Sequence, residues 1–441
     1  MSRVRYSHTI NEEAFLRKTT HAQLIERVPD GSTVLEVGCS TGYISHYLHD
    51  VKRCIVTGIE IDPEAAGLAR AFCRQVIIGD IETDRVMEQL NGRLFDVILL
   101  GDVLEHLVNP DRTLIRLKRF LSPHGRVLIS VPNVANWRLR LSLALGKFQY
   151  TKEGLLDETH LRFFTLKTLR AIIMNTGYTI ESISYWAGGG RPLPMLLTRF
   201  FPGLLAFQFI VSCRPALQDA SPVVPTRGDG TLCRYDCAMV ENPKTTHAQI
   251  LKLVGHHKRV LEAGCSTGRL SKYLMEQGCS VVGVEVEEAA AREARKYCKE
   301  VIVGNIESPA VLGRISGAYD VILFGDVLEH LKRPERVLKD VRQFLDPNGY
   351  VIITLPNIAN FKVRFEVLMG RFQYRETGIL DRSHVRFYTF SSAIQMIRES
   401  GYAIDYFHVA GMNMPMFLMK LNPKFFAPQF VFKVRSADAN S

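Results

Sequence analysis

The chain alternates short apolar runs, many of them rich in Val and Ile, with longer segments in which apolar residues recur at helical spacing. Runs such as DVILL at 96–100 are apolar on both faces, which is typical of strands covered by helices on both sides of a sheet. The alternation predicts an α/β fold with doubly wound, mostly parallel sheets. Seven strands are expected in each half, at 33–37, 55–60, 75–79, 95–100, 125–131, 179–187 and 208–213, and at 259–263, 280–285, 300–304, 319–324, 349–355, 403–409 and 429–434.

The chain contains an internal repeat. The segment THAQLIERVPDGSTVLEVGCSTG from Thr20 returns as THAQILKLVGHHKRVLEAGCSTG from Thr246, and residues 95–140 and 319–364 share 25 identities in 46 positions. A period of about 225 residues is too long for a solenoid, so each copy should be a whole domain. We predict domains at 1–216 and 231–441, joined by a linker at 217–230 that is rich in Pro, Gly, Ser and Asp.

Composition narrows the class of protein. Of 441 residues, 46% are hydrophobic and 23% charged, as in ordinary globular proteins. Nine scattered cysteines favour a reducing compartment over a disulfide framework, and the polar first residues resemble no secretory signal, so we expect a cytoplasmic protein. Charged residues and prolines interrupt the apolar windows 193–210 and 412–434, which speaks against membrane-spanning helices but leaves contact with a membrane surface open.

The net charge of +10 raises the question of a nucleic-acid partner. Recognition of RNA would require basic residues interleaved with aromatic ones, or a known binding module, and the sequence contains neither pattern. We therefore expect no nucleic acid and a small-molecule partner. The sequence assigns no oligomeric state.

A glycine turn follows the first expected strand of each half. Gly38 and Gly42 bracket Ser40 in VGCSTG, where a ligand could approach the amide groups of a helix start. A dinucleotide fingerprint would require glycines at 38, 40 and 43, so that interpretation fails. The turn does match the nucleophile elbow G-x-S-x-G literally. Its place after the first strand, with an acidic end to the next strand, argues against a hydrolase.

Acidic residues end the following strands: Glu60 in GIEID, Asp80 in GDIE and Asp102 in GDVLEHL. A carboxylate at the end of the second strand can accept the hydroxyl groups of a ribose. Together with E-x-G-C-x-T-G, these motifs resemble those of the class I S-adenosylmethionine-dependent methyltransferases. The most similar branch contains small-molecule O-methyltransferases of ubiquinone, polysaccharide and natural-product biosynthesis. The resemblance covers nearly all of both halves and implies two tandem Rossmann-like methyltransferase domains.

The resemblance implies one pocket for S-adenosylmethionine in each half. The turn would hold the methionine part, the second strand end the ribose, and the third the adenine, with the fourth closing the pocket. The two halves differ at a few of these positions, for example Tyr43 in the first and Arg269 in the second. None of these differences removes a hydrogen-bond donor or acceptor whose loss would obviously abolish binding. The implied cofactor residues are Glu36, Gly38, Ser40, Gly42, Glu60, Ile61, Asp80, Ile81 and Asp102, and Glu262, Gly264, Ser266, Gly268, Glu285, Val286, Asn305, Ile306 and Asp326.

The acceptor is expected near the ends of the fourth and fifth strands. A hydroxyl acceptor must lose a proton, which calls for a positioned base. We expect His160 to be that base, Asp157 to fix its tautomer and Arg162 to hold an anionic or hydroxylated acceptor. His106 is a further catalytic candidate, and Arg138 is expected to bind the acceptor from a basic and apolar segment that could form a lid. The counterparts in the second half are His384, Asp381, Arg386, His330 and Lys362.

The turn after the fourth strand could alternatively bind a divalent cation. Asp102, Glu105 and His106 offer suitable ligand types, but three residues so close in sequence need not converge. An acidic helix start explains the same residues, so we expect no metal.

Several functions compete. The leading hypothesis is O-methylation of a sugar or natural-product hydroxyl, with two successive methylations compatible with two halves. We expect the acceptor to be a small molecule that is anionic or glycosylated. Alternatives are methylation of an amine or a carboxylate, one catalytic half beside a regulatory half, and, less favoured, methylation of RNA.

Overall fold

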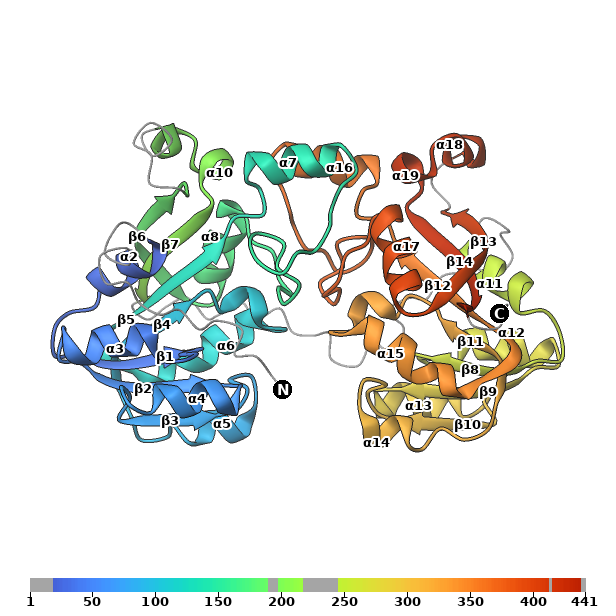
Figure 1. Cartoon of the computed structure of the whole chain (residues 1–441), viewed down its shortest axis with the longest axis horizontal. Coiled ribbons are helices and arrows are strands. Elements are labelled where there is room, and N and C mark those ends of the chain that lie inside the picture. Colours follow the sequence, from blue (N-terminus) through green and yellow to red (C-terminus); the bar gives the residue numbers. More distant parts are fainter. Residues whose placement is uncertain (1–18, 189–196, 217–244, 412–414, 438–441) are drawn as a thin grey trace. The chain divides into compact units, whose positions relative to one another are not determined.

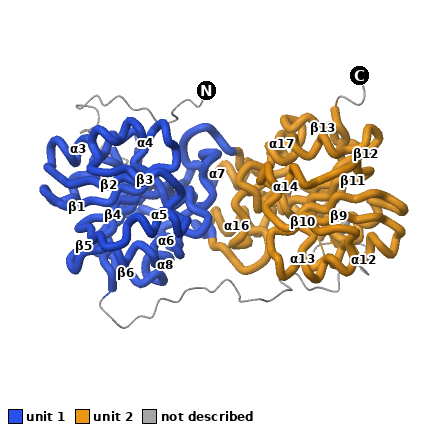
Figure 2. Tube along the Cα trace, turned by 90° about the horizontal axis from the view of Figure 1, so that it is seen from below, with its two compact units in different colours: residues 1–140, 150–226, 369–372 blue, residues 141–149, 227–368, 373–441 orange. Residues whose placement is uncertain are grey.

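The computed structural model describes residues 19–188, 197–216, 245–411 and 415–437. They form two compact units, one comprising 1–140, 150–226 and 369–372, the other 141–149, 227–368 and 373–441 (Figure 2). The expected linker at 217–230 lies outside the described residues.

The first sheet has the strand order β3-β2-β1-β4-β5-β7-β6 (Figure 1). Strands β1 to β5 pair in parallel, whereas β7 runs antiparallel between β5 and β6. The predicted doubly wound α/β fold with mostly parallel, seven-stranded sheets is therefore confirmed. The strands are β1 Thr33–Val37, β2 Ile55–Glu60, β3 Gln75–Ile78, β4 Phe95–Gly101, β5 Leu121–Pro132, β6 Tyr178–Trp186 and β7 Gln208–Pro215.

The second sheet repeats this topology in the order β10-β9-β8-β11-β12-β14-β13. Its last strand is again antiparallel to both of its neighbours. The strands are β8 Arg259–Ala263, β9 Ser280–Glu285, β10 Glu300–Val303, β11 Tyr319–Phe324, β12 Leu345–Pro356, β13 Tyr402–Ala410 and β14 Gln429–Ser436.

Helices connect the strands of each half. In the first half they are α2 Thr20–Glu26, α3 Tyr43–Asp50, α4 Pro63–Ala69, α5 Asp84–Glu88, η1 Leu104–His106, α6 Pro110–Leu117, η2 Lys118–Phe120, α7 Trp137–Ala144, α8 Leu166–Asn175 and α10 Pro202–Leu205. In the second half they are α11 Thr246–Val254, α12 Arg269–Glu276, α13 Glu288–Ala294, α14 Pro309–Leu312, η3 Leu328–His330, α15 Pro334–Val341, η4 Arg342–Phe344, α16 Phe361–Leu368, α17 Phe390–Glu399, α18 Met416–Leu421 and α19 Pro423–Phe426. Among the described residues, none of these helices combines the length and apolar character needed to cross a bilayer.

Both faces of each sheet are buried. In β4, Ile98 and Leu100 pack into one core with α6 and α8, while Val97 and Leu99 pack into another with α2 and α3. This explains why the strand runs are apolar at every position rather than at alternate ones. A fully buried side chain of this size contributes roughly 1.5–3 kcal/mol, so each strand is firmly held.

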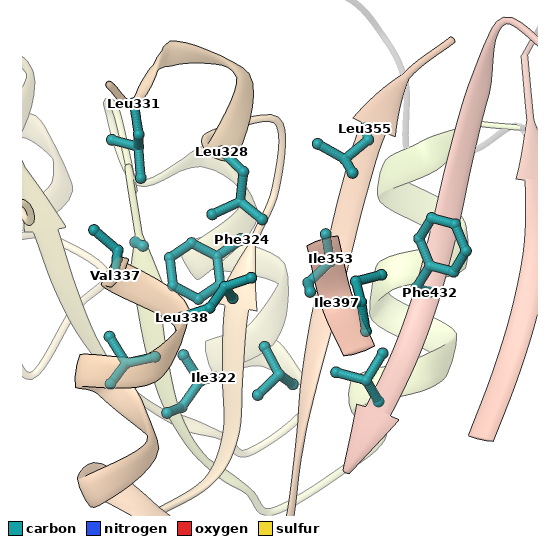
Figure 3. Packing of buried hydrophobic residues seen from close by; sticks show 14 of the residues in the cluster. Ile322, Phe324, Leu328, Leu331, Val337, Leu338, Ile353, Leu355, Ile397 and Phe432 are labelled. Carbon is teal, nitrogen blue, oxygen red and sulfur yellow. The ribbon is translucent and has the colours of Figure 1, made fainter. Parts of the chain in front are cut away.

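Figure 3 shows the corresponding core of the second half. Phe324 of β11, Ile353 of β12 and Phe432 of β14 pack in one cluster with side chains from the covering helices. Leu338 of α15 and Ile397 of α17 contribute to the same cluster. These strands therefore cannot slide along one another without opening the core, and the positions of their carboxyl ends are fixed.

Candidate functional site

The glycine turn after β1 has a tightly constrained backbone. The φ angles of Gly38, Ser40 and Gly42 are 71°, 49° and 84°, all in the left-handed region. Gly42 also has no room for a side chain, because a β-carbon there would lie 2.8 Å from Cα of Ala69 in α4. The second half repeats the turn, with φ angles of 66°, 48° and 75° at Gly264, Ser266 and Gly268. Non-glycine residues at positive φ are strained and are frequent at functional sites. The presence of one in both halves therefore suggests that the turn has a functional role.

Glu60 ties the end of β2 to this turn. Its Oε2 accepts the amide N–H of Ser40 at 2.8 Å, and its Oε1 accepts those of Ile61 and Asp62 at 2.9 Å. Three amide donors hold the carboxylate in one orientation. An ionised carboxylate offers about four acceptor positions, so capacity remains for a ligand hydroxyl.

Glu285 and Val286 repeat this arrangement in the second half. Glu285 accepts the amide N–H groups of Ser266 and Glu287 at 2.8 and 2.9 Å. The residue after the carboxylate is exposed and apolar in both halves, since Ile61 is 66% and Val286 70% exposed. An exposed branched side chain beside a carboxylate offers a flat ring an apolar surface.

The third strand end supplies a polar group and a buried one. Asp80 accepts the amide N–H of Glu82 at 2.9 Å, and Asn305 accepts that of Glu307 at the same distance. Ile81 and Ile306 lie in the hydrophobic cores, each 5% exposed. The structure thus gives the exposed apolar surface of the site to Ile61 and Val286.

Glu36 lies behind the turn and is 2% exposed. Its carboxylate accepts the hydroxyl of Ser45 in α3, and Glu262 accepts that of Ser271 at 2.5 Å. Burial raises the pKa of Glu36 well above its usual range and that of Glu262 to about 8. These carboxyls hold α3 onto β1 and α12 onto β8.

Asp102 stands at the end of β4 with a φ angle of 54°, and Asp326 repeats it at 56°. The carboxylate of Asp102 accepts the hydroxyl of Ser130 at 2.6 Å and the amide of Gln208 at 3.0 Å. Its Oδ2 also lies 3.5 Å from Nε2 of His21. Burial opposes ionisation, but these contacts outweigh it and lower the pKa of Asp102.

Sequence reasoning missed the partners of Asp102. Gln208 lies 106 residues away, so no local spacing points to it. The internal repeat carried a signal, because Gln429 opens the last strand of the second half and donates to Asp326 in the same way. A glutamine at the start of an apolar strand in both halves could have indicated a polar contact at that strand end.

A carboxyl and two imidazoles meet where the turn after β4 contacts the loop before α8. The carbonyl of Glu105 accepts the amide N–H groups of Leu161 and Arg162 at 2.7 and 2.9 Å. These bonds bring His160 to Glu105 and His106, whose potential ligand atoms lie within 4.8 Å of one another. The rings of His106 and His160 pack edge to face at 4.9 Å between centroids.

The second half contains the same cluster. Glu329 accepts the amide N–H groups of Val385 and Arg386, and Nε2 of His384 lies 4.0 Å from Oε1 of Glu329. The rings of His330 and His384 are 4.8 Å apart. We call these two sets, Glu105–His106–His160 and Glu329–His330–His384, the Glu–His–His clusters. The recurrence of every member supports a shared role.

The glutamates of the Glu–His–His clusters lack ordinary partners. Within the described part of the chain, both carboxyl oxygens of Glu105 and of Glu329 are buried without a hydrogen bond. Burial raises the pKa of both carboxyls well above the usual range. Burial, and then the neighbouring His106, lower the pKa of His160 to about 4. A neutral carboxyl and a neutral imidazole are therefore favoured, so the cluster can hold or release a proton.

A backbone group faces the imidazole whose tautomer we expect Asp157 to fix. The carbonyl oxygen of Leu155 lies 3.3 Å from Nδ1 of His160. The carboxylate of Asp157 accepts the amide and hydroxyl of Thr159 at 2.7 and 2.6 Å, which orders the loop. In the second half the carbonyl of Ile379 faces His384, and Asp381 accepts the amide of Ser383.

Of the basic residues expected to bind the acceptor, two contact the turn after the fourth strand and two lie on helices. Arg162 is buried and donates from Nε and Nη2 to the carbonyl of Val108, and Arg386 donates likewise to that of Lys332. Both guanidinium groups therefore brace the turn after the fourth strand. Arg138 lies on α7 over the ring of Trp137, and Lys362 lies on α16 over that of Phe361.

One carboxylate and two imidazoles are also a donor set that divalent transition metals accept. The ligands would be Glu105, His106 and His160, because the Asp102 carboxylate is engaged by Ser130 and Gln208. The cluster can thus serve either a proton or a metal ion.

Comparison with known proteins identifies similarities along both halves. A family model described as a methyltransferase domain matches residues 7–183 and 239–406. The ubiquinone biosynthesis O-methyltransferase of Acinetobacter baylyi is 25% identical over 149 residues, which cover 33% of this chain and 63% of that protein. The enzyme of the same name from Coxiella burnetii is 27% identical over 125 residues, or 28% and 52%. The matches thus span between half and two thirds of these relatives.

Among solved structures, a TehB-like S-adenosylmethionine-dependent methyltransferase from Corynebacterium glutamicum has 18% identity and a TM-score of 0.30, covering 44% of this chain and 86% of that one. A possible histamine N-methyltransferase from Thermotoga maritima has 17% identity and a TM-score of 0.34, covering 46% and 88%.

Proposed function

Because this chain belongs to the class I S-adenosylmethionine-dependent methyltransferase family, with a methyltransferase domain in each half, we propose that it methylates a hydroxyl group of a small molecule. The observation that carries the proposal is the Glu–His–His cluster, which puts a proton-accepting group beside the turn after the fourth strand in both halves. The proposed acceptor is a sugar or natural-product hydroxyl.

The residues at the glycine turn suit the family's cofactor. The carboxylate of Glu60 would accept a ribose hydroxyl, the exposed side chain of Ile61 would cover the adenine ring, and the turn from Gly38 to Gly42 would hold the methionine part. Glu285, Val286 and the turn from Gly264 would act likewise in the second half. When bound, S-adenosylmethionine supplies an electrophilic methyl carbon.

The protein's own contribution is to align the acceptor and remove its proton. With Nδ1 donating to the Leu155 carbonyl, the lone pair of the His160 imidazole lies on Nε2, which would accept the proton. The carboxyl of Glu105 sits in the same cluster and can exchange a proton with this imidazole. In the second half His384 and Glu329 lie together in the same way, with Nε2 of His384 4.0 Å from Oε1 of Glu329.

A hydroxyl acceptor fits this site better than an amine. A neutral amine can attack a methyl group before it loses a proton, whereas a hydroxyl gains its nucleophilicity by giving its proton to a base. A buried base repeated in both halves would be superfluous for an amine. The curated relatives are also named O-methyltransferases.

Methyl transfer to a panel of sugar and phenolic hydroxyl compounds and matched amines tests the proposal. The variant carrying both His160→Ala and His384→Ala should bind S-adenosylmethionine with unchanged affinity and lose at least about a hundredfold in turnover of a hydroxyl acceptor, as expected for loss of a general base. His124→Ala removes an exposed histidine and serves as the matched control. Full turnover in the double variant, or transfer only to amines, would refute O-methylation through these histidines.

The same assay shows whether the Glu–His–His clusters bind a metal ion or only exchange protons. If the clusters hold protons, dialysis against a chelator leaves turnover unchanged. Loss on chelation, with recovery on adding Zn²⁺ or Mg²⁺, would instead assign the clusters to a metal ion.

A further inference from the structure

A pair of thiols lies under the glycine turn of each half, outside the groups used above. The seven cysteines that the structure describes are free thiols. The sulfurs of Cys39, within the turn, and Cys73, which follows α4, both lie beside Gly58 of β2. Those of Cys265 and Cys298 lie likewise beside Gly283 of β9. The pairing is therefore a repeated feature.

A glycine in the second strand makes room for each pair. A β-carbon added at Gly58 would lie 2.6 Å from Sγ of Cys39 and 3.3 Å from Sγ of Cys73. At Gly283 the corresponding distances to Cys265 and Cys298 are 2.5 and 3.4 Å. Any larger residue would push the sulfurs apart, so the strand is shaped around two neighbouring thiols.

The two thiols of a pair differ in reactivity. The pKa of Cys73 is lowered, chiefly by its hydrogen bond with Cys39, whereas the same bond and burial raise that of Cys39. In the second half the pKa of Cys298 is lowered to about 7 by its bond with Cys265. Cys73 and Cys298 are thus the nucleophilic members, since the thiolate is the reactive form.

Cys73 is also the accessible member of its pair. It is partly exposed, while Cys39 is fully buried. Cys73 lines a surface pocket of about 420 Å³ together with His49, Arg53 and Arg74. The charge of His49 favours the thiolate of Cys73, and the pocket leaves a small oxidant a route to it.

We propose that each half contains an oxidisable thiol pair, Cys39 with Cys73 and Cys265 with Cys298, that closes to a disulfide under hydrogen peroxide and thereby weakens cofactor binding. The effect on the cofactor rests on the proposed function, whereas the disulfide does not. The Cys73 thiolate attacks one peroxide oxygen, forming an S–O bond as the O–O bond breaks and hydroxide leaves to become water. The sulfur of Cys39 then attacks that of Cys73, forming the S–S bond as the S–O bond breaks and a second water leaves with the proton of Cys39.

The disulfide would distort the cofactor turn. An S–S bond of about 2.0 Å brings the sulfurs much closer than a hydrogen bond does, so Cys39 must move toward Cys73. Cys39 is held in place by a bond from its amide to the carbonyl of Ile59, and its own carbonyl accepts the amide of Gly42. Movement of Cys39 therefore disturbs both Ser40 and Gly42.

Peptide mapping of the full chain tests the disulfide. After peroxide treatment, alkylation and digestion without reductant, we expect linked peptides joining Cys39 to Cys73 and Cys265 to Cys298. Cys73→Ser and Cys298→Ser should each abolish one link and spare the other. Cys54→Ser is the matched control, because Cys54 lines the same pocket but lies near the carbonyl of Pro29. Oxidation of Cys73 to a sulfinic acid without a link to Cys39 would overturn the proposal.

Calorimetry with S-adenosylmethionine tests the consequence. Oxidised chain should bind about tenfold or more weakly than reduced chain, and dithiothreitol should restore the affinity. Linked chain that binds as tightly as reduced chain would refute the regulatory effect. Reduced chain that binds no S-adenosylmethionine would contradict the proposed function, and the peptide map would still decide whether the disulfides form.

Discussion

Burial changes the protonation of Glu105 and His160 in opposite directions. It raises the pKa of the carboxyl and, with His106, lowers that of the imidazole to about 4. Each shift favours the uncharged form, because the surrounding protein replaces the water that would solvate a charge. Burying these groups lowers the free energy of unfolding at the pH values where they would otherwise be charged. Their burial can therefore be tested without knowing the acceptor.

The free energy of unfolding should depend on His160 between pH 6.5 and about 4. In this window the unfolded imidazole binds a proton that the folded one does not, so stability falls as the pH falls. His160→Gln should flatten that fall by up to about 3 kcal/mol. Urea unfolding near pH 7 and near pH 4 measures this change in the free energy of unfolding.

Two variants control this measurement. His124→Gln changes an exposed histidine and should leave the acid dependence as it is. Glu105→Gln should act with the opposite sign, because a raised carboxyl pKa stabilises the folded state at low pH and loses that effect as the pH rises. An identical acid dependence in the native chain and in His160→Gln would show that His160 is not a depressed, buried imidazole.

Motifs could identify residues at this scale only where function is encoded locally. Glu60 ends β2, Asp102 directly follows β4 and Glu105 lies in η1 just after it, and strand ends follow from the apolar pattern. The contact of Gln208 with Asp102 depends on how β7 aligns with β5, and the Leu155 carbonyl facing His160 depends on the folding of one loop. Neither is a property of residue spacing.

At the level of elements, the sequence predicts where the strands lie, but it does not predict their full order in the sheet. All fourteen expected strands are present, because buried strands leave continuous apolar runs. The first residue of β5 is Leu121 rather than 125, since the strand continues through a register irregularity near Phe95. The insertion of β7 between β5 and β6 is a pairing choice that an apolar pattern cannot specify.

The start of α3 depends on Gly42 for two separate reasons. The residue has a φ angle of 84°, and a β-carbon would meet the backbone of α4. Gly42→Ala should therefore incur both a left-handed conformational cost of about 1–2 kcal/mol and an overpacking cost of about 1–3 kcal/mol. Gly92 has a φ angle of 76° and open space around it, so Gly92→Ala should incur only the first cost.

Chemical denaturation of the two glycine variants separates these contributions. We expect Gly42→Ala to be the less stable by about 1 kcal/mol or more, and to bind S-adenosylmethionine more weakly because the turn must shift. Equal stability of the two variants would mean that α3 and α4 are not tightly packed at this point.

At the level of the whole molecule, duplication has preserved one site and changed its surroundings. The turn, the carboxylate after the second strand and the Glu–His–His cluster occur in both halves. Tyr43, whose hydroxyl lies 3.3 Å from the ring of His21, is replaced by Arg269 at the start of α12. A cation in place of a phenol changes the charge next to the turn, so the two halves should differ in affinity rather than in the kind of ligand.

Calorimetry with S-adenosylmethionine should therefore resolve two binding events on one chain. Glu60→Ala should weaken one event and Glu285→Ala the other, because each carboxylate organises its own turn and provides the acceptor positions for a ribose. Hydrogen bonds to a charged group contribute about 1.5–3 kcal/mol, so each loss should weaken its site by roughly 10–100-fold. Each variant serves as the other's control, since the untouched half reports whether the chain is still folded. If Glu60→Ala left both events intact, or abolished both, the carboxylate after β2 could not be the independent anchor of one pocket per half.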